Sequence, residues 1–354
     1  MEKQKTLKDA LLAASRFYRA EGRMLPWRRD RDPYHIFLSE IMLQQTRVEA
    51  VIPYYERFLS AYPTVEALAR ADEDALFKLW EGLGYYSRAR NLHRAAQRVV
   101  EEFDGRFPSS YDALLTLSGV GKYTAGAIAS ISFGLPKSAV DGNAVRIYAR
   151  LFADGENAAD ERFKERIARE LDEVYPAGDD ALYATQGMME IGQRFCLPNG
   201  APKCDACPLR TLCATGRGDA DYRLYPHKEK KKARRILEKT VLLLTNGEGF
   251  YIRRRPDEGL LAGLWEFPSV DGHKTADEGM TAVRKLGFAP EGAIAAVDGK
   301  HIFTHLEWHM KSFLVPVKGK IPDGFVLATP DELKTKYAIP SAFRTFLEYI
   351  KDNQ

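Results

Sequence analysis

Residues 111–134 read YDALLTLSGVGKYTAGAIASISFG, and this stretch decides the fold of the first part of the chain. Apolar segments with helical spacing flank Gly119 and Gly121, so the pattern predicts a helix, a tight turn and a second helix. Glycine permits a sharp turn with exposed backbone N–H groups, and the second helix adds the positive end of its dipole. Such a turn can hold a phosphate without a side-chain charge. A Gly-x-Gly turn alone is weak evidence, because an ordinary connection between two helices also fits it.

Helical spacing continues on both sides of this turn, from residue 1 to about residue 215. Asp32 followed by Pro33 is a typical helix start. Beyond the helical part, residues 228–235 read KEKKKARR, six basic side chains in eight, and predict an exposed linker.

Short segments rich in β-forming residues follow the basic linker. They include VLLLT, GFYIRRR and LEWHMKSFLVPV, and in the last one Leu306, Trp308 and Met310 alternate with polar residues. A final helix, PSAFRTFLEYIK, places Phe343, Phe346, Leu347 and Ile350 on one face. The fold class is therefore a mainly α N-terminal part followed by a C-terminal α+β domain. The predicted boundaries are 1–225, a linker at 226–235, and 236–354.

Composition narrows the class of protein. The 354 residues are 45% hydrophobic and 29% charged, which is ordinary for a soluble globular protein. No apolar run is long enough to span a bilayer, and the N-terminus lacks the pattern of a signal or transit peptide. We therefore expect an intracellular protein. The formal net charge of +3 is too small to indicate a nucleic-acid partner by itself.

Two carboxylates stand out around the glycine turn. Asp141, in AVDGNAVRIYARL, precedes a predicted helix about twenty residues after the turn, where an N-cap aspartate is common. Glu40, in LSEIMLQQT, has mostly apolar helical neighbours, although a glutamate on a helix is usually solvated. A buried carboxyl has a raised pKa and can stay protonated. One protonated and one ionised acid form the pattern used to cleave glycosidic bonds.

All four cysteines lie in residues 196–213, CLPNGAPKCDACPLRTLC, with the spacing C-x7-C-x2-C-x5-C. Disulfides are unexpected in a reducing compartment. Zinc usually takes two close cysteine pairs, whereas an iron–sulfur cluster accepts compact and uneven spacing. Here only Cys204 and Cys207 form a close pair, so the spacing favours an iron–sulfur cluster and leaves zinc open.

Taken together, these motifs resemble the helix-hairpin-helix DNA glycosylases, and within them the MutY-type adenine DNA glycosylases. The resemblance covers nearly the whole chain and is carried by LPWR, SEIMLQQTRVE, EGLGYYSRARNL, GVGKYTAGA and AVDGN in order. It implies two helical lobes, an iron–sulfur loop, and a C-terminal Nudix-like domain. It also implies base-excision repair of adenine opposite 8-oxoguanine or guanine in double-stranded DNA, by a monomer in the cytoplasm that associates with the nucleoid when bound to DNA.

The resemblance assigns chemical roles to individual residues. It implies a [4Fe–4S] cluster on Cys196, Cys204, Cys207 and Cys213, although the first gap is seven residues where the family usually has six. Glu40 would protonate N7 of adenine, Asp141 would stabilise an oxocarbenium-like sugar, and Asn143 would orient that site. Tyr123 stands where related bifunctional enzymes carry a lysine, and it cannot form a Schiff base. Lys122 is adjacent but points about 100° away around the helix. We therefore expect base excision without strong lyase activity.

The resemblance also assigns binding roles. It places Gly119 and Gly121 at a DNA phosphate. The residues implied for the adenine pocket are Arg23, Leu25, Trp27, Arg28 and Glu190. Those implied for insertion into the duplex at the lesion are Gln45 and Tyr85, with Thr46 and Leu83 nearby. For Leu25 and Leu83 an ordinary core position is an equal alternative.

The C-terminal domain resembles a Nudix domain through GLLAGLWEFP and the strands and helix that follow. Pyrophosphate hydrolysis needs a carboxylate cluster for magnesium, which DEGMTAVRKLGF lacks. The loop HIFTH matches the family's 8-oxoguanine recognition loop, with His301, Phe303, Thr304 and His305. Many members have serine at Thr304, so the hydroxyl is kept and a methyl is added.

Three other functions remain open at this point. A bifunctional pyrimidine-lesion glycosylase and lyase would share the superfamily fold. A Nudix hydrolase of oxidised nucleotides with a DNA-binding module would use the C-terminal domain. A non-enzymatic lesion sensor would have Glu40 exposed and far from Asp141. The basic linker is expected to be a solvated tether, with contact to a repair partner as the alternative.

Overall fold

The computed structural model describes residues 2–227, 229 and 233–353, and its contacts divide the chain into two compact units. The first unit comprises residues 1–70 and 91–230, and the second comprises residues 71–90 and 231–354. The predicted boundaries of 1–225 and 236–354 remain a prediction, but they did not anticipate that residues 71–90 group with the C-terminal part. Of the basic linker, residues 228 and 230–232 lie outside the described residues.

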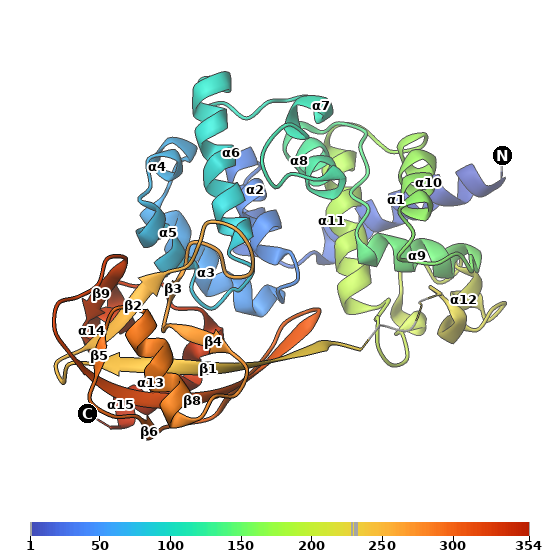
Figure 1. Ribbon diagram of the computed structural model, residues 1–354. Coiled ribbons are helices and arrows are strands. Elements are labelled where there is room, and N and C mark those ends of the chain that lie inside the picture. The colour runs from blue at the N-terminus through green and yellow to red at the C-terminus, as the bar shows by residue number, and fades with distance from the viewer. Residues whose placement is uncertain (1, 228, 230–232, 354) are drawn as a thin grey trace. The chain divides into compact units, whose positions relative to one another are not determined.

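The first unit is helical (Figure 1). Its longest helices, α1 (Glu2–Glu21) and α11 (Asp179–Arg194), pack against each other. With α9 (Gly142–Phe152) and α10 (Glu161–Asp172) they enclose a core that contains Leu11, Tyr148 and Phe163. The other helical elements are η1 (Pro26–Arg28), α2 (Pro33–Leu43), α3 (Val48–Ala61), α4 (Val65–Ala69), α6 (Ser87–Phe103), α7 (Tyr111–Leu114), α8 (Lys122–Phe133), η2 (Cys204–Ala206), α12 (Ala214–Arg217) and η3 (Tyr222–Leu224).

The predicted helix–turn–helix is confirmed as α7, a turn and α8. The predicted start at Asp32 is also confirmed, because its carboxylate caps α2 by accepting from the Tyr34 backbone N–H at 2.8 Å. The apolar pattern that continues past this helix is interrupted between α2 and α3, where Gln45 has φ of +57°.

The second unit is built on one sheet whose main path runs β3-β2-β1-β8-β5. The long strands β1 (Arg235–Thr245) and β8 (Leu306–Lys318) pair in parallel at its centre. The shorter strands are β2 (Phe250–Arg254), β3 (Trp265–Glu266), β4 (Ser269–Asp271), β5 (Ala289–Pro290), β6 (Ile294–Ala295), β7 (Gly299–Ile302) and β9 (Phe325–Ala328). The predicted linker ends too late in the sequence, because Arg235 already belongs to β1 and pairs with Leu306 in the sheet.

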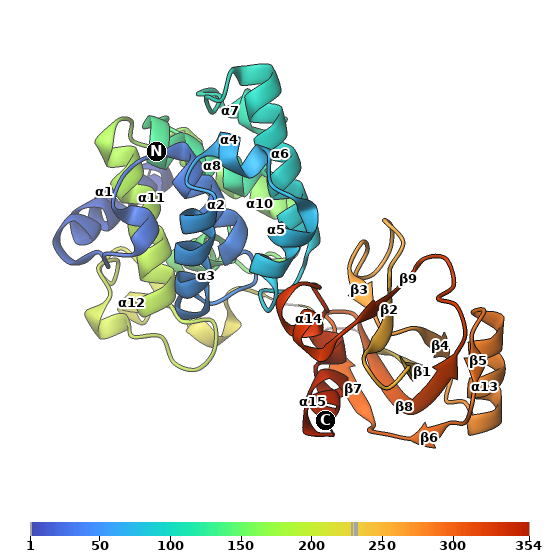
Figure 2. The same ribbon diagram turned by 90° about the vertical axis from the view of Figure 1, so that its left-hand side faces the viewer.

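Helices cover both faces of this sheet (Figure 2). Helix α13 (Ala276–Lys285) packs over a core that includes Leu242 and Phe313. On the opposite face, α14 (Pro330–Thr335) and α15 (Arg344–Asp352) pack over Trp308 and Met310, as the predicted alternation requires. Phe343 lies in η4 (Ser341–Phe343), just before α15. Helix α5 (Glu73–Trp80) completes this unit.

Among the described residues, no helix is both long and apolar enough to cross a membrane.

Candidate active site

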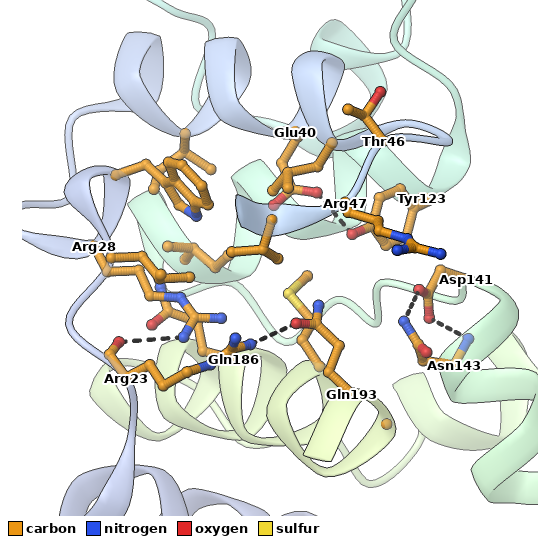
Figure 3. A pocket seen from close by; sticks show the side chains of 18 of the residues that line it. Arg23, Arg28, Glu40, Thr46, Arg47, Tyr123, Asp141, Asn143, Gln186 and Gln193 are labelled. Carbon is orange, nitrogen blue, oxygen red and sulfur yellow. Dashed lines mark hydrogen bonds between the residues drawn. The ribbon is translucent and has the colours of Figure 1, made fainter. Parts of the chain in front are cut away.

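A cavity of about 490 Å³ lies in the first unit between η1, α2, α8 and α11 (Figure 3). This volume is within the range of pockets that bind small organic groups. The predicted site residues that line it are Arg23, Leu25, Trp27, Arg28, Glu40, Thr46, Tyr123, Asp141 and Asn143.

Glu40 lies on α2 with only 4% of its surface exposed. Its helical neighbours Ile36 and Phe37 are buried and apolar, so the carboxylate loses its hydration. Burial raises the pKa of Glu40 to about 7, and the charge of Asp141 adds to the effect. A hydrogen bond from the Tyr123 phenol, 2.7 Å from Oε2, and the charge of Arg28 act in the opposite direction. The side chain is therefore a partly protonated acid at neutral pH.

Tyr123 is the second residue of α8, and its phenol points at Glu40 (Figure 3). Burial raises the pKa of Tyr123 well above its usual value, and the neighbouring carboxylates add to this. The phenol therefore stays neutral and acts as a hydrogen-bond donor.

Asp141 is the N-cap of α9, as the sequence allows. Its Oδ1 accepts from the backbone N–H groups of Asn143 and Ala144 at 2.9 Å, and its Oδ2 accepts from the Asn143 amide at 2.6 Å. Burial raises the pKa of Asp141, while these hydrogen bonds lower it. Three donors hold the carboxylate in place, so it is the better stabilised anion of the two acids.

Asn143 is oriented in turn by Arg146, which is buried on α9. The Arg146 guanidinium donates to Asn143 Oδ1 at 2.8 Å, to the Gly192 carbonyl at 2.8 Å and to the Cys196 carbonyl at 2.7 Å. One side chain thus connects the Asp141 region to the start of the four-cysteine loop.

Glu190, on α11, was predicted in the adenine pocket but does not line the cavity and is fully buried. Arg28 donates to its Oε1 at 2.8 Å, and Arg23 donates through Nε at 2.9 and 3.0 Å. Burial would raise the pKa of Glu190, but the two arginines outweigh it and lower the pKa. Glu190 is therefore a paired anion that fixes Arg23 and Arg28 at the cavity.

Sequence reasoning missed several other cavity residues, among them Arg47, Gln186, Met189 and Gln193. Gln193 accepts from Arg23 Nη2 at 2.5 Å. A signal for the two glutamines was present, because Gln186, Glu190 and Gln193 are spaced by four and three and form one polar stripe on α11.

The Gly-x-Gly turn opens onto a separate groove of about 970 Å³ lined by Gly119, Gly121 and Lys122. Gly119 has φ of +77°, and a Cβ there would lie 2.8 Å from Asn91 Cβ. At Gly121, the N-cap of α8, a Cβ would meet nothing within 4 Å, and no side chain caps the helix. The first N–H groups of α8 are therefore placed as an anion site requires.

Lys122 lies in this groove and not in the cavity. Its amine is exposed and pairs with Glu165 on α10 at 2.7 Å. Glu165 raises the pKa of Lys122 by hydrogen bonding and charge. Among the described residues that line the active-site cavity, none is a lysine.

Two of the four cysteines, Cys196 and Cys213, contact Arg150 of α9. Its Nη1 lies 3.4 Å from Cys196 Sγ, and its carbonyl is 3.3 Å from Cys213 Sγ. Burial raises the pKa of Cys207 to about 12, and each of the other three thiols raises it further through charge. The four sulfurs therefore share one environment. In the described part of the chain, no group of three or more ligating side chains is arranged for a single metal ion.

The remaining predicted residues lie elsewhere. Gln45 is exposed at the end of α2, and Leu83 is buried in the second unit outside the cavities described here. A separate cavity of about 470 Å³ lies within the second unit. It is lined by Tyr85 and by the predicted residues of the HIFTH loop, which are His301, Phe303, Thr304 and His305.

The Nudix-like unit shows no carboxylate cluster among its described residues. In α13, Glu278 forms a capping box with Thr275. The Glu278 backbone N–H donates to the Thr275 hydroxyl, and the Glu278 carboxylate accepts from the Thr275 backbone N–H.

Comparisons with known proteins agree with this geometry. Residues 38–173 match the HhH-GPD superfamily of base excision DNA repair proteins, and residues 240–349 match the NUDIX domain. The adenine DNA glycosylase of Buchnera aphidicola subsp. Schizaphis graminum is 31% identical over 308 residues, covering 85% of this chain and 84% of the relative. The human adenine DNA glycosylase is 31% identical over 400 aligned residues, covering 94% of this chain and 72% of the relative.

A solved structure supports the fold of the first unit. A thermostable thymine-DNA glycosylase superposes with a TM-score of 0.54 at 29% identity, covering 60% of this chain and 98% of that one. The first unit has the helical glycosylase fold, the second matches the NUDIX domain, and the sequence identity extends over most of the chain. The chain belongs to the adenine DNA glycosylases, DNA N-glycosylases of base excision repair.

Proposed function

We propose that the enzyme removes adenine placed opposite 8-oxoguanine or guanine in double-stranded DNA, with Glu40 as the general acid. One observation carries the proposal. A buried carboxyl whose pKa is raised to about 7 faces the same cavity as Asp141, a carboxylate held by three hydrogen bonds. This pairing of a protonated and an ionised acid is suited to cleaving an N-glycosidic bond.

The proposed chemistry proceeds in two steps. Glu40 transfers its proton to N7 of adenine, and the bond between N9 and the sugar C1′ breaks with its electrons going to the base. Asp141 stabilises the positive charge on the sugar. Water then adds to C1′ and gives its proton to the Glu40 carboxylate, which regenerates the acid. Adenine must leave the base stack to reach a cavity of this kind.

The enzyme is proposed to be largely monofunctional. A lyase step needs an uncharged amine near C1′ to form a Schiff base. Tyr123 occupies the position implied for such a lysine, and Lys122 is held as a cation by Glu165 in the neighbouring groove. A bifunctional glycosylase and lyase is therefore the less supported reading.

We further propose a [4Fe–4S] cluster on Cys196, Cys204, Cys207 and Cys213. The donor set fits, because four thiols share one partly buried environment. Bound there, the cluster would cross-link the loop, whose first cysteine is tied through Arg146 to Asn143.

Discrimination of the opposite base is proposed to reside in the loop of residues 301–305. Burial lowers the pKa of His301, and the charge of Arg344 adds to this, which favours a neutral imidazole. Phe303 packs on His301 with ring centroids 4.5 Å apart. These contacts support a preformed loop with Thr304 and His305 at its surface.

The test uses a duplex labelled on one strand with a single adenine opposite 8-oxoguanine. After incubation with protein whose cluster absorbance is intact, half of the sample is heated in alkali. A break at the adenine only after alkali supports monofunctional excision. A break without alkali shows lyase activity and directs attention to Lys122, first by borohydride trapping. No break in either half overturns the substrate proposal. A matched duplex with thymine in place of adenine controls for non-specific cleavage.

A further inference from the structure

A hydrogen bond joins two exposed segments of the second unit. The Tyr85 phenol, in the turn of residues 82–87, and the Thr304 hydroxyl, at the tip of the 301–305 loop, are hydrogen-bonded to each other. Either hydroxyl can be the donor. Both side chains line the cavity of about 470 Å³, and 47% of the surface of Tyr85 remains exposed.

The turn that carries Tyr85 is built to hold its shape. The Gly84 carbonyl accepts from Trp80 Nε1 and from Arg88 Nη2, both at 3.1 Å, and Arg88 also donates to the Leu83 carbonyl at 2.9 Å. Tyr85 itself has φ of +48°, a conformation that a non-glycine residue keeps only when its surroundings fix it. The phenol is therefore presented from a rigid base.

The loop that carries Thr304 is equally well supported. It connects β7 to β8, and the Phe303 N–H donates to the Leu306 carbonyl at 2.9 Å. The Phe303 ring packs on Trp308 with centroids 5.0 Å apart. The backbone of each partner is thus fixed, while the two hydroxyls themselves lie at the surface.

An exposed hydroxyl pair contributes no more to folding than one ordinary hydrogen bond, because water competes for both groups. The effect of the pair on binding depends on which groups the two hydroxyls contact after their mutual hydrogen bond is broken. Separating Tyr85 from Thr304 breaks one hydrogen bond and frees two hydroxyls, each able to donate or accept. A purine edge that offers a donor beside an acceptor satisfies both hydroxyls. A purine edge with an acceptor alone satisfies only one of them.

These two edges belong to 8-oxoguanine and guanine. 8-Oxoguanine has an N–H at N7 next to a carbonyl at C8, whereas guanine has an acceptor N7 next to C8–H. For one broken bond, 8-oxoguanine returns two bonds and guanine returns one. Sites that hydrogen-bond a group discriminate strongly against an analogue that lacks it.

We propose that the Tyr85–Thr304 hydrogen bond is a latch that 8-oxoguanine opens with net gain and guanine opens with none. The proposal rests on the proposed function and extends it, because it makes the protein's own hydrogen bond the competitor that suppresses binding opposite guanine. Tyr85 and Thr304 are thus specificity-determining residues that act as a pair.

The latch makes an unusual prediction for single variants. In Thr304→Val or Tyr85→Phe the latch is gone and one hydroxyl remains. Guanine then gains a bond without losing one, so affinity opposite guanine should rise by about three- to tenfold, the range of one hydrogen bond. Affinity opposite 8-oxoguanine should hardly change, since one bond is lost and the latch no longer has to be broken. In the double variant, affinity opposite 8-oxoguanine should fall by a similar factor and affinity opposite guanine should match the parent protein.

The experiment measures dissociation constants of the full-length protein for duplexes that carry 2′-fluoro-2′-deoxyadenosine, which resists excision, opposite 8-oxoguanine or guanine. Thr304→Ser keeps the hydroxyl and should behave as the parent. Thr281→Val, which removes an exposed hydroxyl on α13, and Tyr349→Phe on α15 are the matched controls and should leave both constants unchanged.

The sign of the change opposite guanine decides the outcome. If Thr304→Val weakens binding opposite 8-oxoguanine and leaves guanine unchanged, the hydroxyls contact the base without competing with each other, and the latch is overturned. If the parent protein excises adenine opposite neither base, the proposed function itself fails. Parent activity together with an unchanged guanine affinity in both single variants overturns the latch alone.

Discussion

Two tyrosine phenols in this molecule make one hydrogen bond each to a functional neighbour, and their surroundings give the bonds different uses. Tyr123 is partly buried and donates to Glu40 inside the active-site cavity, 2.7 Å from Oε2. Tyr85 is half exposed and bonds Thr304 at the surface of the second unit. Away from water, a hydrogen bond to a carboxyl changes its pKa and hence its chemistry. At the surface, the same phenol adds little stability and can exchange partners.

The comparison is tested most severely by replacing Glu40 with Gln. Glutamine keeps the size of the side chain and can still accept from Tyr123, but it cannot release a proton at neutral pH. We expect single-turnover excision of adenine to fall by about 10³-fold, within the range for loss of general acid catalysis, without loss of thermal stability. Glu56→Gln, on the exposed face of α3, is the matched control. Near-normal excision by the Glu40 variant would sink the proposed mechanism.

A second test compares the loss of stability at the buried Glu190–Arg28 pair beside the active-site cavity with the loss at the exposed Tyr85–Thr304 bond. Glu190→Gln removes the buried charge that pairs with Arg28, whose side chain is only 5% exposed. Breaking such a pair leaves an uncompensated buried cation, and we expect a loss of about 3–5 kcal/mol in the free energy of unfolding. Thr304→Val, at the exposed latch, should change it by only about 0.5–1.5 kcal/mol, the range of one hydrogen bond. Denaturant titrations with equal m-values would measure both, and equal losses would contradict the contrast.

The sequence predicted those features that depend on neighbouring residues. The glycine turn, the helix start at Asp32 and the alternation in β8 are local patterns, and each is present in the structure. Apolar neighbours also indicated a raised pKa for Glu40, but the opposing contributions of Tyr123 and Asp141 come from helices about a hundred residues away along the chain. No local pattern contains that information.

The largest omission of the sequence analysis was the grouping of residues 71–90 with the C-terminal part of the chain. Residues 71–90 pack with the C-terminal part through contacts such as Glu73 with Arg254 at 2.6 Å and Arg90 with the Ala262 carbonyl at 2.8 Å. Sequence reasoning had no means to place these partners together, because each pair is separated by more than 170 residues. The latch was therefore invisible to it, although Tyr85 and Thr304 were both named.

The pH dependence of excision sharpens the catalytic half of the comparison. Glu40 acts in its protonated form, and its pKa is raised to about 7, so the rate should fall about tenfold for each pH unit above that value. Asp141 acts as the anion, and burial raises its pKa, so the rate should also fall on the acidic side, starting above the ordinary range of aspartate. Single-turnover rates between pH 5 and 9 would give a bell-shaped profile. A flat profile on the alkaline side would remove Glu40 as the acid.

Replacing Tyr123 with Phe should have the smallest effect and is the most specific test of the buried phenol. The hydrogen bond from Tyr123 stabilises the Glu40 carboxylate, so its loss raises the pKa of Glu40 further. The protonated fraction at neutral pH increases, and the alkaline limb of the rate profile should move to higher pH while the maximum rate changes by less than about tenfold. A packing role alone would lower stability and leave the limb in place. Tyr349→Phe, outside the cavity, supplies the reference profile, and a shift of the limb to lower pH in the Tyr123 variant would show that the phenol favours the protonated acid instead.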